Sequence, residues 1–259
     1  MAPCCWKFSA IFLLACCFGI PLLAEVIPLT SSQQTSVSGG ALACDPLCQQ
    51  FNYPGETDPG AYFSSSTSGS ATDSFHYRWA TSSAWAGGTG ATISDHQIIL
   101  DLGGGSSFSG NWSLQGADAN VSDQYSLVFD LTSSSLVHVT GGFVASTSGG
   151  GPGAVFGSLD GEIDLAGPGF HFDQVAPPMG QGFGLDQPFE ASFTLPPGVY
   201  TLNGTAVASA DQVYALNATS NIDVSLEADF TDIPEPGWIS WLAGLFIASA
   251  IGLARSRGK

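Results

Sequence analysis

Positive charge is nearly absent from the central part of this sequence. The chain has five Lys and Arg residues against 22 Asp and Glu residues. All of the acidic residues lie between Glu25 and Glu235, and Arg78 is the only basic residue in that interval, so its formal charge is 1 − 22 = −21. Nucleic acids bind to clustered cations that release counterions, and a field of this sign repels a polyanion. We therefore expect no nucleic-acid partner.

Cysteine is equally scarce in this interval. Four of the six cysteines lie near the N-terminus, so only Cys44 and Cys48 remain in the central part. In an oxidising compartment the simple interpretation is a local disulfide between them. Without a nearby His or further Cys, the pair supplies too few ligands for structural zinc, and its spacing differs from the redox Cys-x-x-Cys motif.

Familiar catalytic motifs are also missing. The four His residues form no His-Glu-x-x-His pattern, and the chain contains no Gly-x-Ser-x-Gly nucleophile motif. With 22 acidic residues, some pair at the separation of a glycosidase could arise by chance. The sequence therefore indicates a non-enzymatic protein and no catalytic residue.

The C-terminal region carries a long apolar run. Residues 237–254 contain no ionisable side chain, and as a helix these 18 residues would rise about 27 Å, close to the thickness of a bilayer's hydrocarbon core. The run is followed by three basic residues, Arg255, Arg257 and Lys259. The positive-inside bias keeps this end in the cytoplasm, so the residues before the helix are expected on the far side of the membrane.

Immediately before this helix stand Pro234, Glu235 and Pro236. The order Pro-Glu-Pro, hydrophobic helix and short basic end, spanning residues 233–259, resembles the PEP-CTERM sorting signal of Gram-negative bacteria. The resemblance implies recognition and processing by an exosortase, and a role beside exopolysaccharide or biofilm production. The alternative is an ordinary C-terminal membrane anchor in which the prolines end the helix.

The N-terminal residues also predict export. Lys7 is followed by an almost uninterrupted apolar stretch, so residues 1–24 are typical of a secretory signal peptide cleaved after Ala24. A lipoprotein signal ending at Cys16 is the alternative, although the chain stays apolar as far as Leu23. We expect a protein held transiently in the membrane by its tail and then located at the cell surface or in the extracellular matrix.

The remaining chain has the pattern of an all-β domain. Residues 222–230 alternate apolar and polar side chains without a break, as a half-buried strand does. We predict an irregular Ser/Gly/Pro-rich arm over residues 25–70 and a jelly-roll-like antiparallel β-sandwich over residues 71–232. The expected strands are residues 74–80, 92–102, 111–114, 125–131, 136–140, 143–146, 155–165, 170–175, 189–195, 199–208, 212–217 and 222–230.

Two sets of residues are candidates for binding. Asp160, Glu162 and Asp164 occupy alternate positions, so on a strand they would share one face and could hold Ca²⁺; the alternative is a solvated outer face. Trp79, Trp85 and Trp112 could stack on sugar rings if exposed, or fill the core if buried. Trp85 is the best of these, because it lies among Ser, Ala and Gly residues.

These observations favour an exported, non-enzymatic surface or matrix protein associated with exopolysaccharide. The alternative is a carbohydrate-binding, lectin-like module assisted by Ca²⁺. No other cofactor is expected.

Overall fold

The computed structural model describes residues 25–43, 61–75, 78–111, 116–150, 156–177, 184–212 and 217–233. All regular elements in these ranges are β-strands, and they include no helix that could cross a membrane. The predicted signal peptide, the Cys44–Cys48 pair and residues 234–259 lie outside the described ranges.

The strands form two antiparallel sheets. The first, sheet A, has the order β10-β9-β12-β7-β1-β2, and the second, sheet B, has the order β11-β8-β13-β6-β4-β3, with β5 paired to β6. The strands of sheet A are β1 (Val26–Leu42), β2 (Ala61–Ser65), β7 (Gly116–Leu131), β9 (Phe156–Gly167), β10 (Phe170–Val175) and β12 (Gly198–Gln212). Those of sheet B are β3 (Ser68–Phe75), β4 (Arg78–Ala86), β5 (Gly90–Ser94), β6 (Gln97–Gly110), β8 (Ser135–Gly150), β11 (Gly184–Leu195) and β13 (Asn217–Asp232).

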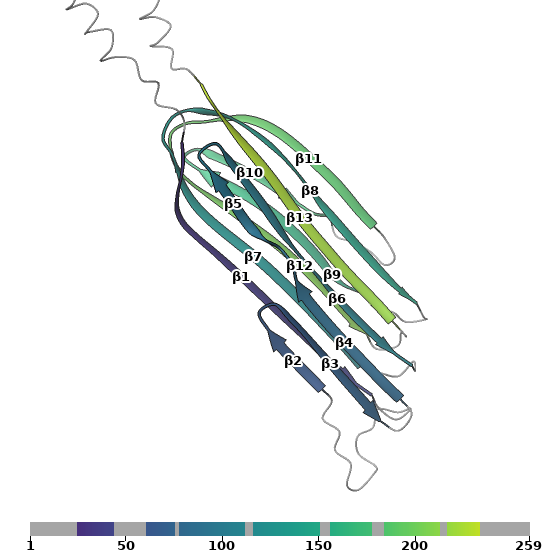
Figure 1. Ribbon diagram of the computed structural model, residues 1–259. Helices are drawn as coiled ribbons and strands as arrows, with labels where there is room; N and C mark the ends of the chain where they lie inside the picture. Colours follow the sequence, from purple (N-terminus) through teal and green to yellow (C-terminus); the bar gives the residue numbers. More distant parts are fainter. Residues whose placement is uncertain are drawn as a thin grey trace, which may run out of the picture.

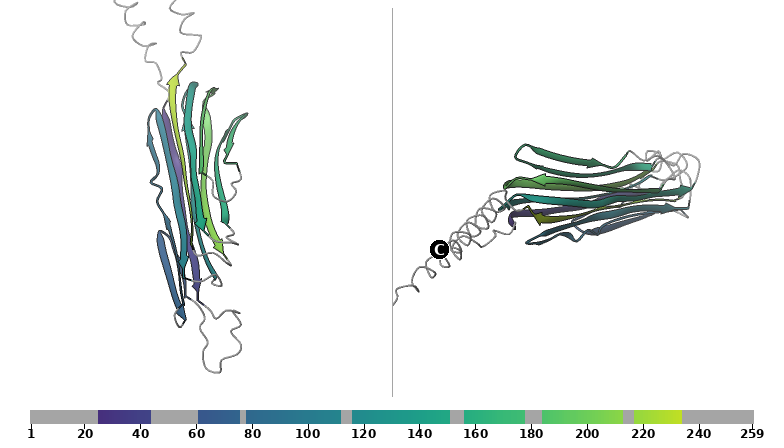
Figure 2. Two further views of the ribbon diagram at one scale, coloured as in Figure 1. Left: turned by 90° about the vertical axis from the view of Figure 1, so that its right-hand side faces the viewer. Right: turned by 90° about the horizontal axis from the view of Figure 1, so that it is seen from above.

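The two sheets pack face to face along a common long axis (Figures 1 and 2). Strands β6 and β13 of sheet B lie over β7 and β12 of sheet A. Two packed antiparallel sheets are the architecture expected of a β-sandwich. The prediction of an all-β fold with this layering is confirmed.

Alternation along the long strands determines which side chains enter the core. In β13, every second residue from Ala218 to Phe230 is buried, while Asp223 and Glu227 are exposed. Because successive side chains of a strand point to opposite faces, one residue of slip would bury these carboxylates. The alternation therefore fixes the register of β13 between β6 and β8.

Bulky side chains fill the core at one end of the sandwich. The ring of Phe129 stacks on Tyr200 with centroids 5.7 Å apart, and meets Phe230 edge-on at 5.9 Å. The Tyr200 hydroxyl donates a hydrogen bond of 2.8 Å to the Pro196 carbonyl, four residues upstream. This bond resembles the tyrosine corner of other sandwich domains and ties the start of β12 to the preceding turn.

Small side chains fill the core toward the other end. Sheet A contributes Ala119, Ala206 and Ala208 there, and sheet B contributes Ala84 and Ala218, all of them buried. Because protein interiors are close-packed, this part of the core has little room for a larger side chain.

The described chain enters and leaves the sandwich at the end with the bulky core. The Thr132 amide donates to the Glu25 carbonyl at 3.2 Å, and the Ile233 amide donates to the Ser134 carbonyl at 3.1 Å. Both contacts are made by the short connection between β7 and β8. The first and last described residues therefore lie beside the same turn, as Figure 1 also shows for the start of β1 and the end of β13.

The predicted irregular arm over residues 25–70 is wrong in its described part, because β1 and β2 pair within sheet A and β3 begins in sheet B. Residues 44–60 of the predicted arm lie outside the described ranges. The 17-residue β1 pairs along β7, so its Ser and Gly residues are held by a neighbouring backbone rather than by their own β-propensity. The sandwich accordingly starts at β1.

Several strand boundaries also differ from the prediction. The expected strand 74–80 spans the end of β3 and the start of β4, which pair as a hairpin with Phe75 opposite Arg78. The expected strand 212–217 runs from the end of β12 to the start of β13, and its residues 213–216 lie outside the described ranges. The expected strand 92–102 is split into the hairpin β5–β6, which turns at Asp95 and His96. The expected break between residues 140 and 143 is absent, because β8 continues through Gly141 and Gly142 between β11 and β13.

The small-residue part of the core generates a stability prediction. Ala208→Leu should lower the free energy of unfolding by about 1–3 kcal/mol, because the extra carbons overpack a fully buried position. Val207→Leu is the matched control, since its side chain faces the other side of β12 and should change stability by no more than about 0.5 kcal/mol. Urea unfolding measures both, and equal midpoints for the two variants would contradict the assigned register.

Candidate functional site

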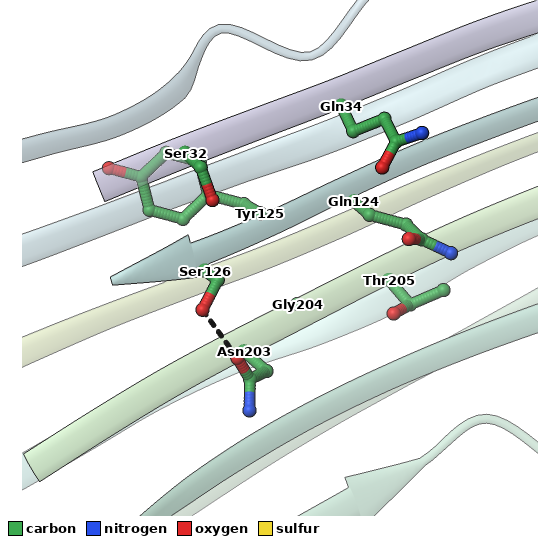
Figure 3. Close-up of a pocket in the computed structure, with 8 residues that line it drawn as sticks. All are labelled: Ser32, Gln34, Gln124, Tyr125, Ser126, Asn203, Gly204 and Thr205. Carbon is green, nitrogen blue, oxygen red and sulfur yellow. Dashed lines mark hydrogen bonds between the residues drawn. The ribbon is translucent and has the colours of Figure 1, made fainter. Parts of the chain in front are cut away.

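A shallow groove crosses the outer face of sheet A (Figure 3). Its volume is about 340 Å³, and its side chains come from three neighbouring strands, β1, β7 and β12. Ser32, Ser126 and Asn203 form one row across these strands. Gln34, Gln124 and Thr205 form the next row.

The side chains that face out into this groove are neutral hydrogen-bonding groups. The Ser126 hydroxyl donates to the Asn203 amide oxygen at 2.8 Å, which leaves the NH₂ group of that amide available to donate to a ligand. Two Gln amides add further donors and acceptors. Such a surface can bind a neutral polar molecule by hydrogen bonds, but it offers no carboxylate, imidazole or amine for acid–base catalysis.

The three candidate calcium ligands share one face of β9 but do not form a cluster. Asp160 and Glu162 are exposed, and the Asp164 carboxylate lies 2.8 Å from Nε2 of His171 on β10. Within the described ranges, no group of three or more His, Cys, Asp or Glu side chains is arranged to hold a metal ion. Alternate positions on a strand are roughly 6.6 Å apart, and the partner of Asp164 is an imidazole, so the structure does not assemble the predicted calcium site.

The structure brings together a Ser, His and Glu group that sequence reasoning missed. Ser192 on β11 lies across from His138 on β8, with Oγ 2.9 Å from Nδ1, and Oε1 of Glu190 lies 3.6 Å from Nε2. No local motif marks this group, since it depends on the pairing of β8 with β11.

This group lacks the features of a nucleophilic site. The Glu190 side chain is 72 % exposed and too far from Nε2 for a hydrogen bond, so it does not orient the ring. A working nucleophile needs an oriented base and preorganised donors for the developing oxyanion. The Ser192–His138–Glu190 arrangement is therefore a set of neighbouring side chains on an open sheet surface.

The outer face of sheet B carries the two described tryptophans. Trp79 and Trp85, both on β4, are 41 % and 47 % exposed, so neither fills the core. Trp112, the third candidate, lies outside the described residues. That these rings bind sugar stays a prediction.

The indole of Trp85 lies across two glycines. A Cβ on Gly105 would come within 2.7 Å of Trp85 Nε1, and a Cβ on Gly87 would overlap with Cζ3 of the same ring. Only glycine allows this close approach, so the ring rests on the strand surface. The side-chain oxygen of Asn221 on β13 also lies above Gly105, so the Asn221 amide is beside the Trp85 ring.

Two carboxylates lie near this ring. Asp223 on β13 is opposite Gly103, and Asp101 is two residues earlier on β6. The Asp223 side chain reaches solvent, but partial burial of its carboxylate raises its pKa above the ordinary value, and the charge of Asp101 raises that pKa further. The ionised form of Asp223 is thus less favourable in the folded protein than in the unfolded chain.

A fully buried carboxylate, that of Asp123, lies between the sheets. Asp123 of β7 accepts a hydrogen bond of 2.9 Å from Nε2 of Gln33 and one of 3.3 Å from the Gly103 amide of sheet B. The second bond links the two sheets directly. This position supports the fold beside the groove and has no access to a ligand.

Comparisons with known proteins identify no relative. No protein-family model matches the chain, and no curated protein matches it either. A structure of the infectious bursal disease virus Gt strain is 14 % identical with a TM-score of 0.20, covering 83 % of this chain and 63 % of that chain. A structure of the Gx strain is 12 % identical with a TM-score of 0.19, covering 84 % and 69 %. Similarity at this level carries no argument about fold or function.

The raised pKa of Asp223 generates a pH prediction. Because the folded-state pKa lies above the unfolded one, ionised Asp223 destabilises the protein at neutral pH, and this effect disappears as the pH falls through the raised pKa. Asp223→Asn should therefore raise the urea midpoint at neutral pH, with a gain that shrinks on acidification. Asp160→Asn, an exposed carboxylate on sheet A, is the control. A gain for Asp223→Asn that is independent of pH would contradict this explanation.

Proposed function

We propose that the protein is an exported, non-enzymatic surface or extracellular-matrix protein that is delivered and processed through its C-terminal tail. The observation that carries this proposal is the sequence of residues 233–259, with Pro234, Glu235 and Pro236 before an apolar run and a basic end. An exosortase is the proposed processing enzyme, and exopolysaccharide is the proposed neighbour of the mature protein. The flanking helices and the jelly-roll-like class of the sandwich belong to the same proposal.

The arrangement of the sandwich is compatible with attachment at one end. The described chain begins and ends beside the β7–β8 turn, so a membrane or matrix link on either side would act at that end. A 16-residue strand such as β13 is about 53 Å long at roughly 3.3 Å per residue. The far end and both outer faces of the sheets would then project away from the point of attachment.

A second candidate function is carbohydrate binding, and the groove on sheet A favours it. Neutral amides and hydroxyls in two rows suit the hydroxyl groups of an uncharged glycan. The strongly negative central part of the chain disfavours anionic polymers by long-range repulsion. Binding through these groups needs no metal ion.

The sorting proposal predicts a change in location. Deletion of residues 234–259 should abolish retention at the cell surface and send the protein to the medium, because both the membrane stop and the processing signal are removed. Combined substitution of Pro234, Glu235 and Pro236 by Ala should leave the apolar run intact but block processing, so the uncleaved protein stays in the membrane fraction.

Cell fractionation with immunoblotting measures both effects, and Glu227→Ala in the sandwich is the control. If the truncated protein distributes like the intact one, the sorting proposal fails. If the triple substitution alone has no effect, the tail is an ordinary anchor.

The groove predicts a loss of glycan binding. Gln124→Ala combined with Asn203→Ala should weaken binding to a neutral polysaccharide by about tenfold, since each lost hydrogen bond contributes roughly 0.5–1.5 kcal/mol. Asn120→Ala is a matched control, because Asn120 is exposed on β7 outside the groove. Affinity electrophoresis in gels containing dextran or a soluble β-glucan compares the three proteins. Equal retardation of all of them would exclude the groove as the binding site.

A further inference from the structure

We propose that the outer face of β4 is a binding track for a linear neutral glycan, with Trp79 and Trp85 as two stacking platforms. This inference rests on the proposed association with polysaccharide and assigns it a surface distinct from the groove on sheet A. The two rings are six residues apart on one face of the same strand, which corresponds to roughly 20 Å. That separation matches a chain of several sugar units better than a single sugar.

Hydroxyl groups occupy the surface between the two rings. Thr81 and Ser83 follow Trp79 at alternate positions of β4, and each pairs with a hydroxyl on a neighbouring strand. Thr81 Oγ1 is 3.2 Å from Thr72 Oγ1, and Ser83 Oγ is 2.8 Å from Ser107 Oγ. The surface between the platforms is therefore neutral and able to both donate and accept hydrogen bonds.

The Trp85 platform is preorganised for stacking. Gly105 and Gly87 let the indole rest on the strand surface, so one ring face is covered and the ring is still 47 % exposed. The Asn221 amide lies at the same glycine and can bind hydroxyls at the edge of a stacked sugar. A ring held in one place loses little further conformational entropy when a ligand binds.

A purely structural role explains only one of the two tryptophans. Aromatic side chains are used to cover glycines in neighbouring strands, and Trp85 lies directly opposite Gly105. Trp79 lies opposite Ser74 of β3. The backbone N–H of Trp79 donates a hydrogen bond of 2.9 Å to Oδ1 of Asn111. Glycine coverage therefore leaves the exposed ring of Trp79 unexplained, whereas a two-platform track accounts for both rings.

The chemistry of a sugar chain fits this arrangement. The apolar C–H face of a pyranose can stack on indole, and its hydroxyl edges can bond to the Thr and Ser rows. One chain that reaches both rings gains from effective concentration, so its affinity should exceed that of a fragment that reaches only one. Sulfated or uronic-acid polymers are disfavoured by the negative charge of the domain.

The test compares glycans of increasing length. Isothermal titration of the mature protein with neutral gluco-oligosaccharides should show a steep rise in affinity once the chain spans about 20 Å. Trp79→Ala and Trp85→Ala should each remove that rise and lower the affinity for long chains by roughly tenfold or more, as expected when a two-site contact becomes a one-site contact. Trp→Phe at either position should keep part of the affinity for long chains that Trp→Ala removes. Val144→Ala, at an exposed apolar residue on the same sheet, is the control.

The outcomes separate this inference from the proposed function. If both Trp→Ala variants keep the full length dependence while the Gln124/Asn203 double variant loses binding, the track is wrong and the groove is the glycan site. If Trp85→Ala only lowers the urea midpoint without changing affinity, the ring is structural and the inference is overturned. If the wild-type protein binds no neutral chain of any length, the track is also wrong, but tail-dependent surface retention still tests the sorting proposal independently.

Discussion

The burial of one face of each sheet against the other is the constraint on which the rest of the structure depends. Long strands such as β12 and β13 keep apolar and small side chains on the inner side along most of their length. A sheet with one buried face cannot slip by a single residue without exposing its core, so packing between the sheets fixes the register of these strands. This register also determines which side chains of neighbouring strands lie side by side on the outer faces. The rows of the sheet A groove and the hydroxyls beside Trp79 and Trp85 are aligned only because the inner faces are.

The two ends of the core differ in side-chain size and in how much they stabilise the fold. Aromatic and large aliphatic side chains gather where the described chain enters and leaves, around Phe129 and Tyr200. Further along, the inner faces are mainly Ala, Ser and Gly, and among the described residues Ser82, Ser106 and Ser220 have buried hydroxyls without a hydrogen-bond partner. Such groups cost stability, so we infer that the bulky end supplies most of the hydrophobic stabilisation. This is also the end at which a membrane or matrix link would act.

The strands that could be predicted from the sequence are those whose apolar–polar pattern is complete within the strand itself. The unbroken alternation of residues 222–230 identified β13, and the expected strand 170–175 coincides with β10. Local pattern failed where neighbouring strands supply the order, as in β1 and at Gly141 and Gly142 of β8. The candidate sites divide in the same way. Sequence context selected Trp85, which is exposed, but the groove and the Ser192–His138 pair depend on strands far apart in sequence and could not be read locally.

The proposed location and role both require that the C-terminal tail is a processing signal rather than a permanent part of the mature protein. Intact mass spectrometry of the protein recovered from the cell surface and from the medium tests this claim most directly. We expect a mass that lacks residues 1–24 and the apolar run 237–254. A mature protein that retains residues 237–254 would contradict this claim.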